Sequence, residues 1–88
     1  MEREKIFEAI NQERISQDGL WQRNERRKVM YSFTAPHLLL LGEKINAMQT
    51  LWYKGESTPQ DFIKIAALAV RALEEVTDEK FWESKGVK

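Results

Sequence analysis

The sequence has 88 residues and contains no cysteine, two prolines and four glycines. Without cysteine, the chain can form neither a disulfide scaffold nor a thiolate metal site. So few residues that interrupt regular structure predict a small number of long elements. Fourteen basic and fourteen acidic residues cancel. This balance argues against a protein whose whole surface binds nucleic acid.

Long hydrophobic runs are missing too. The longest aliphatic run, residues 38–41, is far too short to cross a bilayer. No charged segment followed by an apolar one suggests a secretion signal. We therefore expect a cytoplasmic protein with no membrane partner. We expect one domain over residues 1–88, and because so short a chain buries a modest core, we expect it to oligomerise as a dimer or tetramer.

The spacing of the hydrophobic residues predicts helices throughout. The first helix is expected from about residue 2 to Asp18, where the following Gly19 is a natural stop. Ile6, Ile10 and Arg14 share one face of this helix. Residues 22–33 show no sustained period, and we expect a loop there with a short helical turn.

The second helix is expected to begin at Thr34, as a cap, with Pro36 in its first turn, and to end at Lys54-Gly55. Its apolar residues cover about half of the circumference, so we expect it to pack on two sides. The main stripe steps by three and four residues through Leu38, Leu41, Ile45, Met48 and Trp52.

The third helix has the strongest local signal, with Thr58 as cap, Pro59 as first residue and Asp61 completing a capping box. It is expected to end near residues 77–78. Its polar back is expected to expose Lys64 together with Arg71 and Glu75. Its apolar face carries Phe62, Ile65, Ala66, Ala69, Val70, Leu73 and Val76.

These elements predict an all-α protein, a small helical bundle completed by oligomerisation. Its centre is expected to be an antiparallel helix hairpin across residues 55–57. A short last turn with Phe81 and Trp82 is expected to close over the core.

Candidate chemistry is sparse. The single histidine, His37, has no nucleophile arranged around it, and we expect a surface or capping role. No glycine-rich phosphate loop is present. The basic stretch 23–28 contains Arg23, Arg26, Arg27 and Lys28 and offers contacts to phosphates, although a solvated loop or helix end fits so short a run better.

Three stretches resemble a known family. Residues 10–18 followed by Trp21 are similar to its N-terminal pattern Glu-Arg-x-x-Gln-x-x-x-Trp, residues 38–47 occupy the place of its acidic helix, and residues 61–74 resemble its second acidic helix. Together they resemble the small all-α MazG-like nucleotide pyrophosphohydrolases of bacteria and their phages. The resemblance implies helical dimers or tetramers. It also implies Mg²⁺-dependent cleavage of nucleoside triphosphates to monophosphate and pyrophosphate.

The departures from this family concern its metal ligands. Glu43 stands at the first acid of the first cluster, but Lys44 and Ala47 stand at the next two. On the other acidic helix Asp61 keeps the first acid and Lys64 replaces the second. Two carboxylates beside two ammonium groups make a poor site for Mg²⁺, which prefers octahedral oxygen coordination.

The favoured hypothesis is therefore a non-catalytic MazG-like binding protein, encoded by a phage or bacterium. It would bind a nucleotide, another phosphorylated ligand or a host protein, without a cofactor. Its candidate ligand-binding residues are Arg14, Gln17, Trp21, Glu43, Lys44 and Asp61.

Two alternatives stay open. One is an atypical Mg²⁺-dependent nucleoside triphosphate pyrophosphohydrolase, with Glu43 and Asp61 as metal ligands, joined by Glu13 and acids from a partner chain. The other is a small nucleic-acid-binding protein that uses the basic stretch 23–28, for which phosphate contacts would make binding fall steeply with salt.

Overall fold

The computed structural model describes residues 1–20 and 25–86, which form five helices and no strand. The predicted all-α class is confirmed. None of the helices in this part of the chain is long and apolar enough to cross a membrane. In chain order the helices are α1 (Arg3–Leu20), α2 (Glu25–Met30), α3 (Thr34–Tyr53), α4 (Pro59–Glu75) and α5 (Glu79–Ser84).

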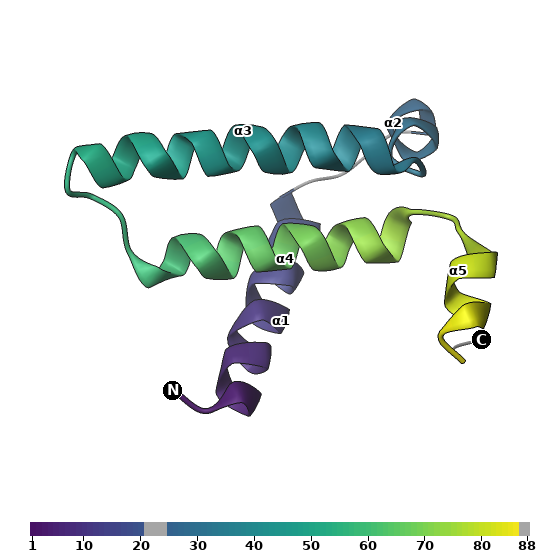
Figure 1. Ribbon diagram of the computed structural model, residues 1–88, viewed down its shortest axis with the longest axis horizontal. Helices are drawn as coiled ribbons and strands as arrows, with labels where there is room; N and C mark the ends of the chain where they lie inside the picture. Colours follow the sequence, from purple (N-terminus) through teal and green to yellow (C-terminus); the bar gives the residue numbers. More distant parts are fainter. Residues whose placement is uncertain (21–24, 87–88) are drawn as a thin grey trace.

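The predicted antiparallel hairpin consists of α3 and α4, which lie side by side (Figure 1). The turn between them follows from its sequence. Gly55 takes a left-handed φ of 74°, and the N–H groups of Gly55 and Glu56 donate to the carbonyls of Trp52 and Leu51. This pair of hydrogen bonds is the Schellman motif, which commonly ends a helix. The capping box at the start of α4 is also present, and the Thr58 N–H donates to Asp61 Oδ2 at 3.1 Å.

Two predicted helix ends were wrong. Gly19 lies inside α1, which continues to Leu20, because glycine permits a helix end but does not impose one. Thr34 is the first residue of α3 and not its cap. The cap is Phe33, whose backbone is extended and which offers no side-chain hydrogen bond. The turn after α2 explains why the cap is Phe33. The Phe33 N–H donates to the Met30 carbonyl and closes that turn, so α3 begins at the next residue.

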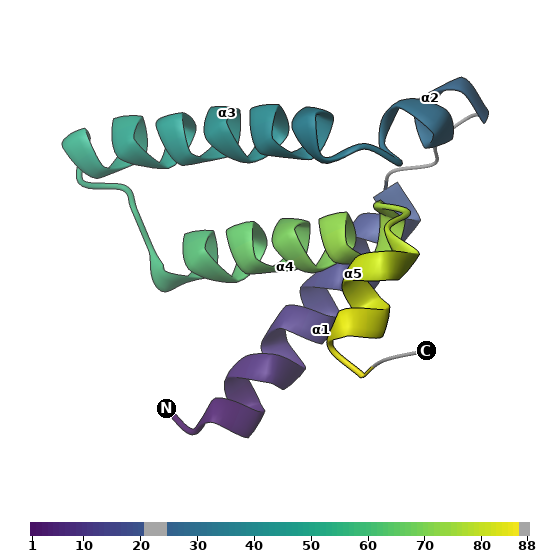
Figure 2. The ribbon, with the colours of Figure 1, turned by 45° about the vertical axis from the view of Figure 1, so that its right-hand side comes forward.

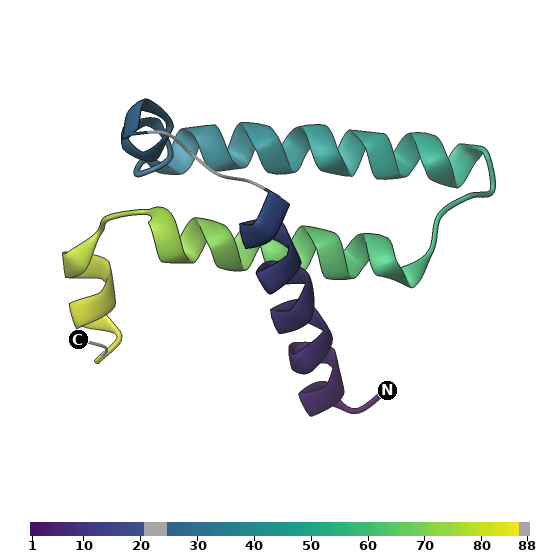
Figure 3. The same ribbon diagram turned by 180° about the vertical axis from the view of Figure 1, so that it is seen from behind.

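The helix α1 packs on the hairpin and crosses one of its faces over the middle of α4 (Figures 2 and 3). Glu13 accepts a hydrogen bond from Gln60 at the start of α4, and the neighbouring Arg14 donates to Glu74 near its end. The crossing point between them is at Ala67, which is completely buried. A small side chain there lets the two helix backbones approach closely.

This crossing reverses one prediction about α4. Arg71 was expected on an exposed polar back, but it is buried, and its Nε donates to Glu75 Oε1 at 2.8 Å. Helical spacing puts Arg71 on the side of α4 that α1 covers, four residues after Ala67. Lys64 is exposed, as expected.

His37 was also placed wrongly, since it is buried and not on the surface. Its Nε2 donates to the Tyr31 carbonyl oxygen, 2.7 Å away, and lies 3.5 Å from Glu75 Oε2. The imidazole thus joins the start of α3 to the end of α4. Both contacts are made by Nε2, and these polar partners offset the burial of that nitrogen.

The centre of the described structure is unusually polar. The only buried hydrophobic residues in it are Ala67 and Leu68, while four polar side chains are buried with them: Arg14, Gln17, His37 and Arg71. The expected second packing side of α3 is not filled within one chain, because Leu38, Ile45 and Trp52 stay exposed.

We predict that Arg14→Ala lowers the free energy of unfolding by about 1–2 kcal/mol, because the hydrogen bonds to Glu74 and Asp18 and the packing of the alkyl stem are lost. Urea unfolding followed by circular dichroism at fixed chain concentration measures this. The matched control is Arg3→Ala on the exposed start of the same helix, expected to change stability by less than about 0.5 kcal/mol. Equal effects of both substitutions would contradict the role of Arg14.

Candidate ligand-binding cavity

A cavity of about 360 Å³ lies where α1, α3 and α4 meet. Helical spacing explains its walls: Lys44, Ala47 and Leu51 lie on one side of α3, and Asp61, Lys64 and Leu68 on one side of α4. The polar lining residues are Glu13, Gln17, Lys44, Asp61 and Lys64, and the apolar ones are Leu20, Ala47, Met48, Leu51, Ile65 and Leu68.

Gln17 is the least satisfied group of this cavity. The residue is only 6% exposed, and its Oε1 is buried without a hydrogen-bond partner in the part of the chain that the structure describes. A buried acceptor left unpaired costs about 1–3 kcal/mol. The oxygen itself has almost no accessible surface, so it is a stability cost of the fold and not a contact point for a ligand.

The charged residues that line the cavity differ in their hydrogen-bond and ion-pair partners. The Asp61 carboxylate accepts from the Thr58 N–H, and Glu13 accepts from Gln60 Nε2 at 3.4 Å. Neither Lys44 nor Lys64 has an ion-pair partner among residues 1–20 and 25–86. The ammonium groups are thus the charges that remain available to an anionic ligand.

The structure brings together three of the six predicted ligand-binding residues. Gln17, Lys44 and Asp61 line the cavity. Glu43 is exposed and does not line it, and Trp21 lies outside the described residues. Lys64 also lines the cavity, although its predicted place on the polar back of α4 argued against a role in ligand binding. Its spacing of three residues from Asp61 and four from Leu68 was the signal for a shared wall.

Arg14, the remaining predicted residue, has a structural place. Its guanidinium donates to Glu74 and Asp18 and does not line the cavity. Burial by itself lowers the pKa of Arg14, but hydrogen bonds and attraction from Glu74 and Asp18 outweigh it and raise the pKa above its ordinary value. Arg14 is therefore a permanent cation that holds α1 against α4.

The predicted metal ligands are not brought together with further donors. Asp61 lines the cavity and Glu43 does not. Across residues 1–20 and 25–86, no group of three or more histidine, aspartate or glutamate side chains is placed to hold a metal ion. The basic stretch falls on the short helix α2, where Arg26, Arg27 and Lys28 are exposed; Arg23 lies outside the described residues.

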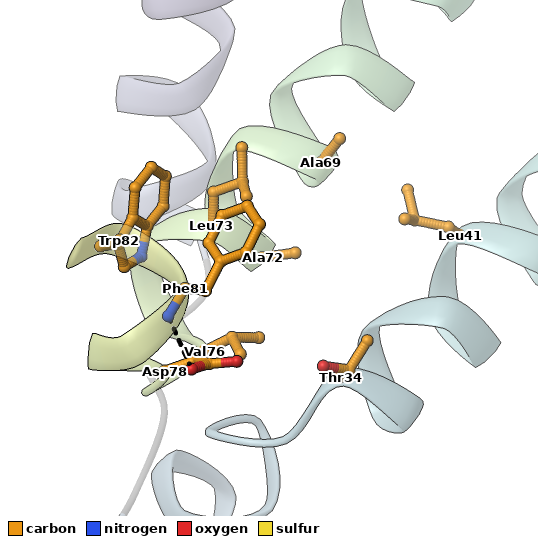
Figure 4. Close-up of a pocket in the computed structure, with 9 residues that line it drawn as sticks. All are labelled: Thr34, Leu41, Ala69, Ala72, Leu73, Val76, Asp78, Phe81 and Trp82. Carbon is orange, nitrogen blue, oxygen red and sulfur yellow. Dashed lines mark hydrogen bonds between the residues drawn. The ribbon is translucent and has the colours of Figure 1, made fainter. Parts of the chain in front are cut away.

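Two further pockets lie on the other side of the hairpin and are mainly apolar. One, of about 410 Å³, is lined by the start of α3, the end of α4 and α5 (Figure 4). Its acid, Asp78, accepts a hydrogen bond from the Phe81 N–H and so caps α5. The other, of about 500 Å³, is lined by Ile45, Trp52 and Phe62 among others. Neither gathers charged groups as the three-helix cavity does.

Comparisons with protein-family models, with curated proteins and with solved structures found no match.

We predict that Gln17→Met raises the free energy of unfolding by about 1 kcal/mol, since methionine fills similar space without a buried unpaired oxygen. Thermal and urea unfolding measure the change. Gln12→Met, on the exposed side of α1, is the matched control and should leave stability unchanged. A loss of stability in Gln17→Met would show that the amide is satisfied in the free protein.

Proposed function

We propose that the chain is a non-catalytic binding protein whose ligand is a nucleotide or another small phosphorylated molecule. The ligand would occupy the cavity between α1, α3 and α4. The observation that carries this proposal is a cavity lined by two lysines, Lys44 and Lys64, that have no ion-pair partner among the described residues.

The lining groups suit such a ligand in different ways. Lys44 and Lys64 act on a phosphate as point charges. Met48, Leu51 and other apolar residues offer a surface for a planar ring. A volume of about 360 Å³ lies at the lower end of ordinary small-molecule pockets, which favours a mononucleotide over a larger ligand.

The non-catalytic part of the proposal rests on the positions that resemble the MazG-like family. Lys44, Ala47 and Lys64 stand where that resemblance implies acids, and all three line the cavity. Positive charge there attracts a phosphate directly and repels a divalent cation. A phosphorylated ligand is thereby bound without Mg²⁺.

We predict that the protein binds a nucleoside mono- or diphosphate in buffer containing EDTA, measured by isothermal titration calorimetry. Lys44→Ala and Lys64→Ala should each weaken binding by about 10-fold, the loss of one charge-assisted hydrogen bond. The control is Lys54→Ala, at the C-cap of α3 and outside the cavity. No binding by any nucleotide or phosphorylated sugar in the panel would refute the proposal.

The enzymatic alternative is tested by incubation with Mg²⁺ and nucleoside triphosphates. We predict no steady release of pyrophosphate, because Glu43 and Asp61 do not line the same cavity. Glu43→Gln is the decisive variant. Steady release by the unmodified protein that is abolished in Glu43→Gln would overturn the non-catalytic assignment.

A further inference from the structure

The face of the α3–α4 hairpin opposite α1 is apolar and uncovered. It is turned toward the reader in Figure 1, and no helix crosses it there. Helical spacing aligns its side chains in two parallel stripes. We call it the open face and define it by Leu38, Ile45 and Trp52 of α3 and Phe62, Ala69 and Leu73 of α4.

Large apolar side chains of this face are exposed to water in the single chain. Trp52 is 65% exposed and Phe62 73%, and the two apolar pockets lie at its opposite ends (Figure 4 shows one of them). None of its six defining residues is charged. Contiguous apolar patches of this kind mark interaction surfaces.

The chain as a whole also exposes more surface than a compact monomer of its mass. The chain exposes 7322 Å², whereas a folded monomer of 10.4 kDa is expected to expose about 5,400 Å². The excess is roughly 1,900 Å², within the range of about 1,000–2,500 Å² that each chain buries in an obligate homodimer. The radius of gyration, 14.6 Å, likewise exceeds the value of about 12 Å expected for a compact chain of this length.

We propose that a second copy of the chain covers the open face, with the two hairpins packed face to face about a two-fold axis. A two-fold interface brings the same patch from both chains together, and an apolar patch without charged residues meets its own copy without repulsion. Ala69 lies between the larger Phe62 and Leu73 on the face and leaves room for side chains of the other copy. The result is a four-helix bundle with one α1 on each outer side.

This inference does not rest on the proposed function. The ligand cavity lies between the hairpin and α1, on the side away from the open face. Each chain in the dimer therefore keeps an accessible cavity, and dimerisation and ligand binding can fail separately.

The first test is the mass of the full chain in solution, measured by sedimentation equilibrium and native mass spectrometry. The expected mass is twice that of one chain, and the thermal midpoint should rise with protein concentration, because association stabilises the folded state by mass action. A chain that stays a folded monomer across the accessible concentration range would overturn the proposal. So would a monomer that folds only when lipid vesicles or a different protein are added.

Two adjacent leucines provide matched variants. Leu38, on the open face, is 61% exposed, and Leu39 is 74% exposed and lies about 100° further round α3, outside the open face. Leu38→Glu should raise the dimer dissociation constant by at least about 100-fold, since an unpaired carboxylate would be buried in the interface. Leu39→Glu should leave it unchanged. Equal effects of the two substitutions, or no effect of Leu38→Glu, would show that the chains contact each other elsewhere. Either result would refute the open face as the dimer interface.

A measurement on the unmodified protein covers the case in which Leu38→Glu does not fold. In a dimer of one ¹³C-labelled and one unlabelled copy, filtered nuclear Overhauser spectra report contacts between chains only. Methyl groups of Leu38 and Ile45 should contact the rings of Trp52 or Phe62 of the other copy, and Leu39 should contact none. Contacts between chains that involve only α1 or α5 would contradict the proposed arrangement.

Discussion

The crossing of α1 over α4 is the contact on which the rest of this structure depends. Ala67 is the one completely buried residue of the described chain, and it lies where the two helices meet. Around it the contact is polar: Arg14 bridges Glu74 and Asp18, and Glu13 meets Gln60. Because the crossing helix covers one side of the hairpin, it fixes which residues of α4 are buried and where a cavity can form.

Polar and apolar side chains are distributed differently here from those of an ordinary small domain. Charged and amide side chains occupy the centre, while Leu38, Trp52 and Phe62 face outward. Hydrophobic burial is the main favourable term in folding, so a chain arranged this way draws little stability from its own core. The polar centre and the apolar open face are then two parts of one arrangement: the first carries the proposed ligand site, and the second supplies the proposed contact with another copy.

The two proposals use opposite sides of the same hairpin. On the α1 side, α3 and α4 contribute Lys44, Lys64 and Asp61 to a cavity with mixed polar and apolar walls. On the other side the same helices present only apolar and small residues over the six positions of the open face. A helix with two functional sides needs apolar residues over much of its circumference, and α3 has them in its stripe from Leu38 to Trp52.

The sequence by itself determined the local structure. The Thr58–Asp61 capping box, the left-handed Gly55 and the three-and-four spacing of α3 depend on residues near one another in the chain, so the all-α class and the hairpin could be predicted from them. Tertiary structure alone decided the burial of Arg71 and His37 and the place of Lys64 on a cavity wall. Those outcomes depend on where α1 crosses α4 and on how the start of α3 meets the end of α4. Spacing within one helix shows which residues share a side, but the neighbouring helices decide which side is covered.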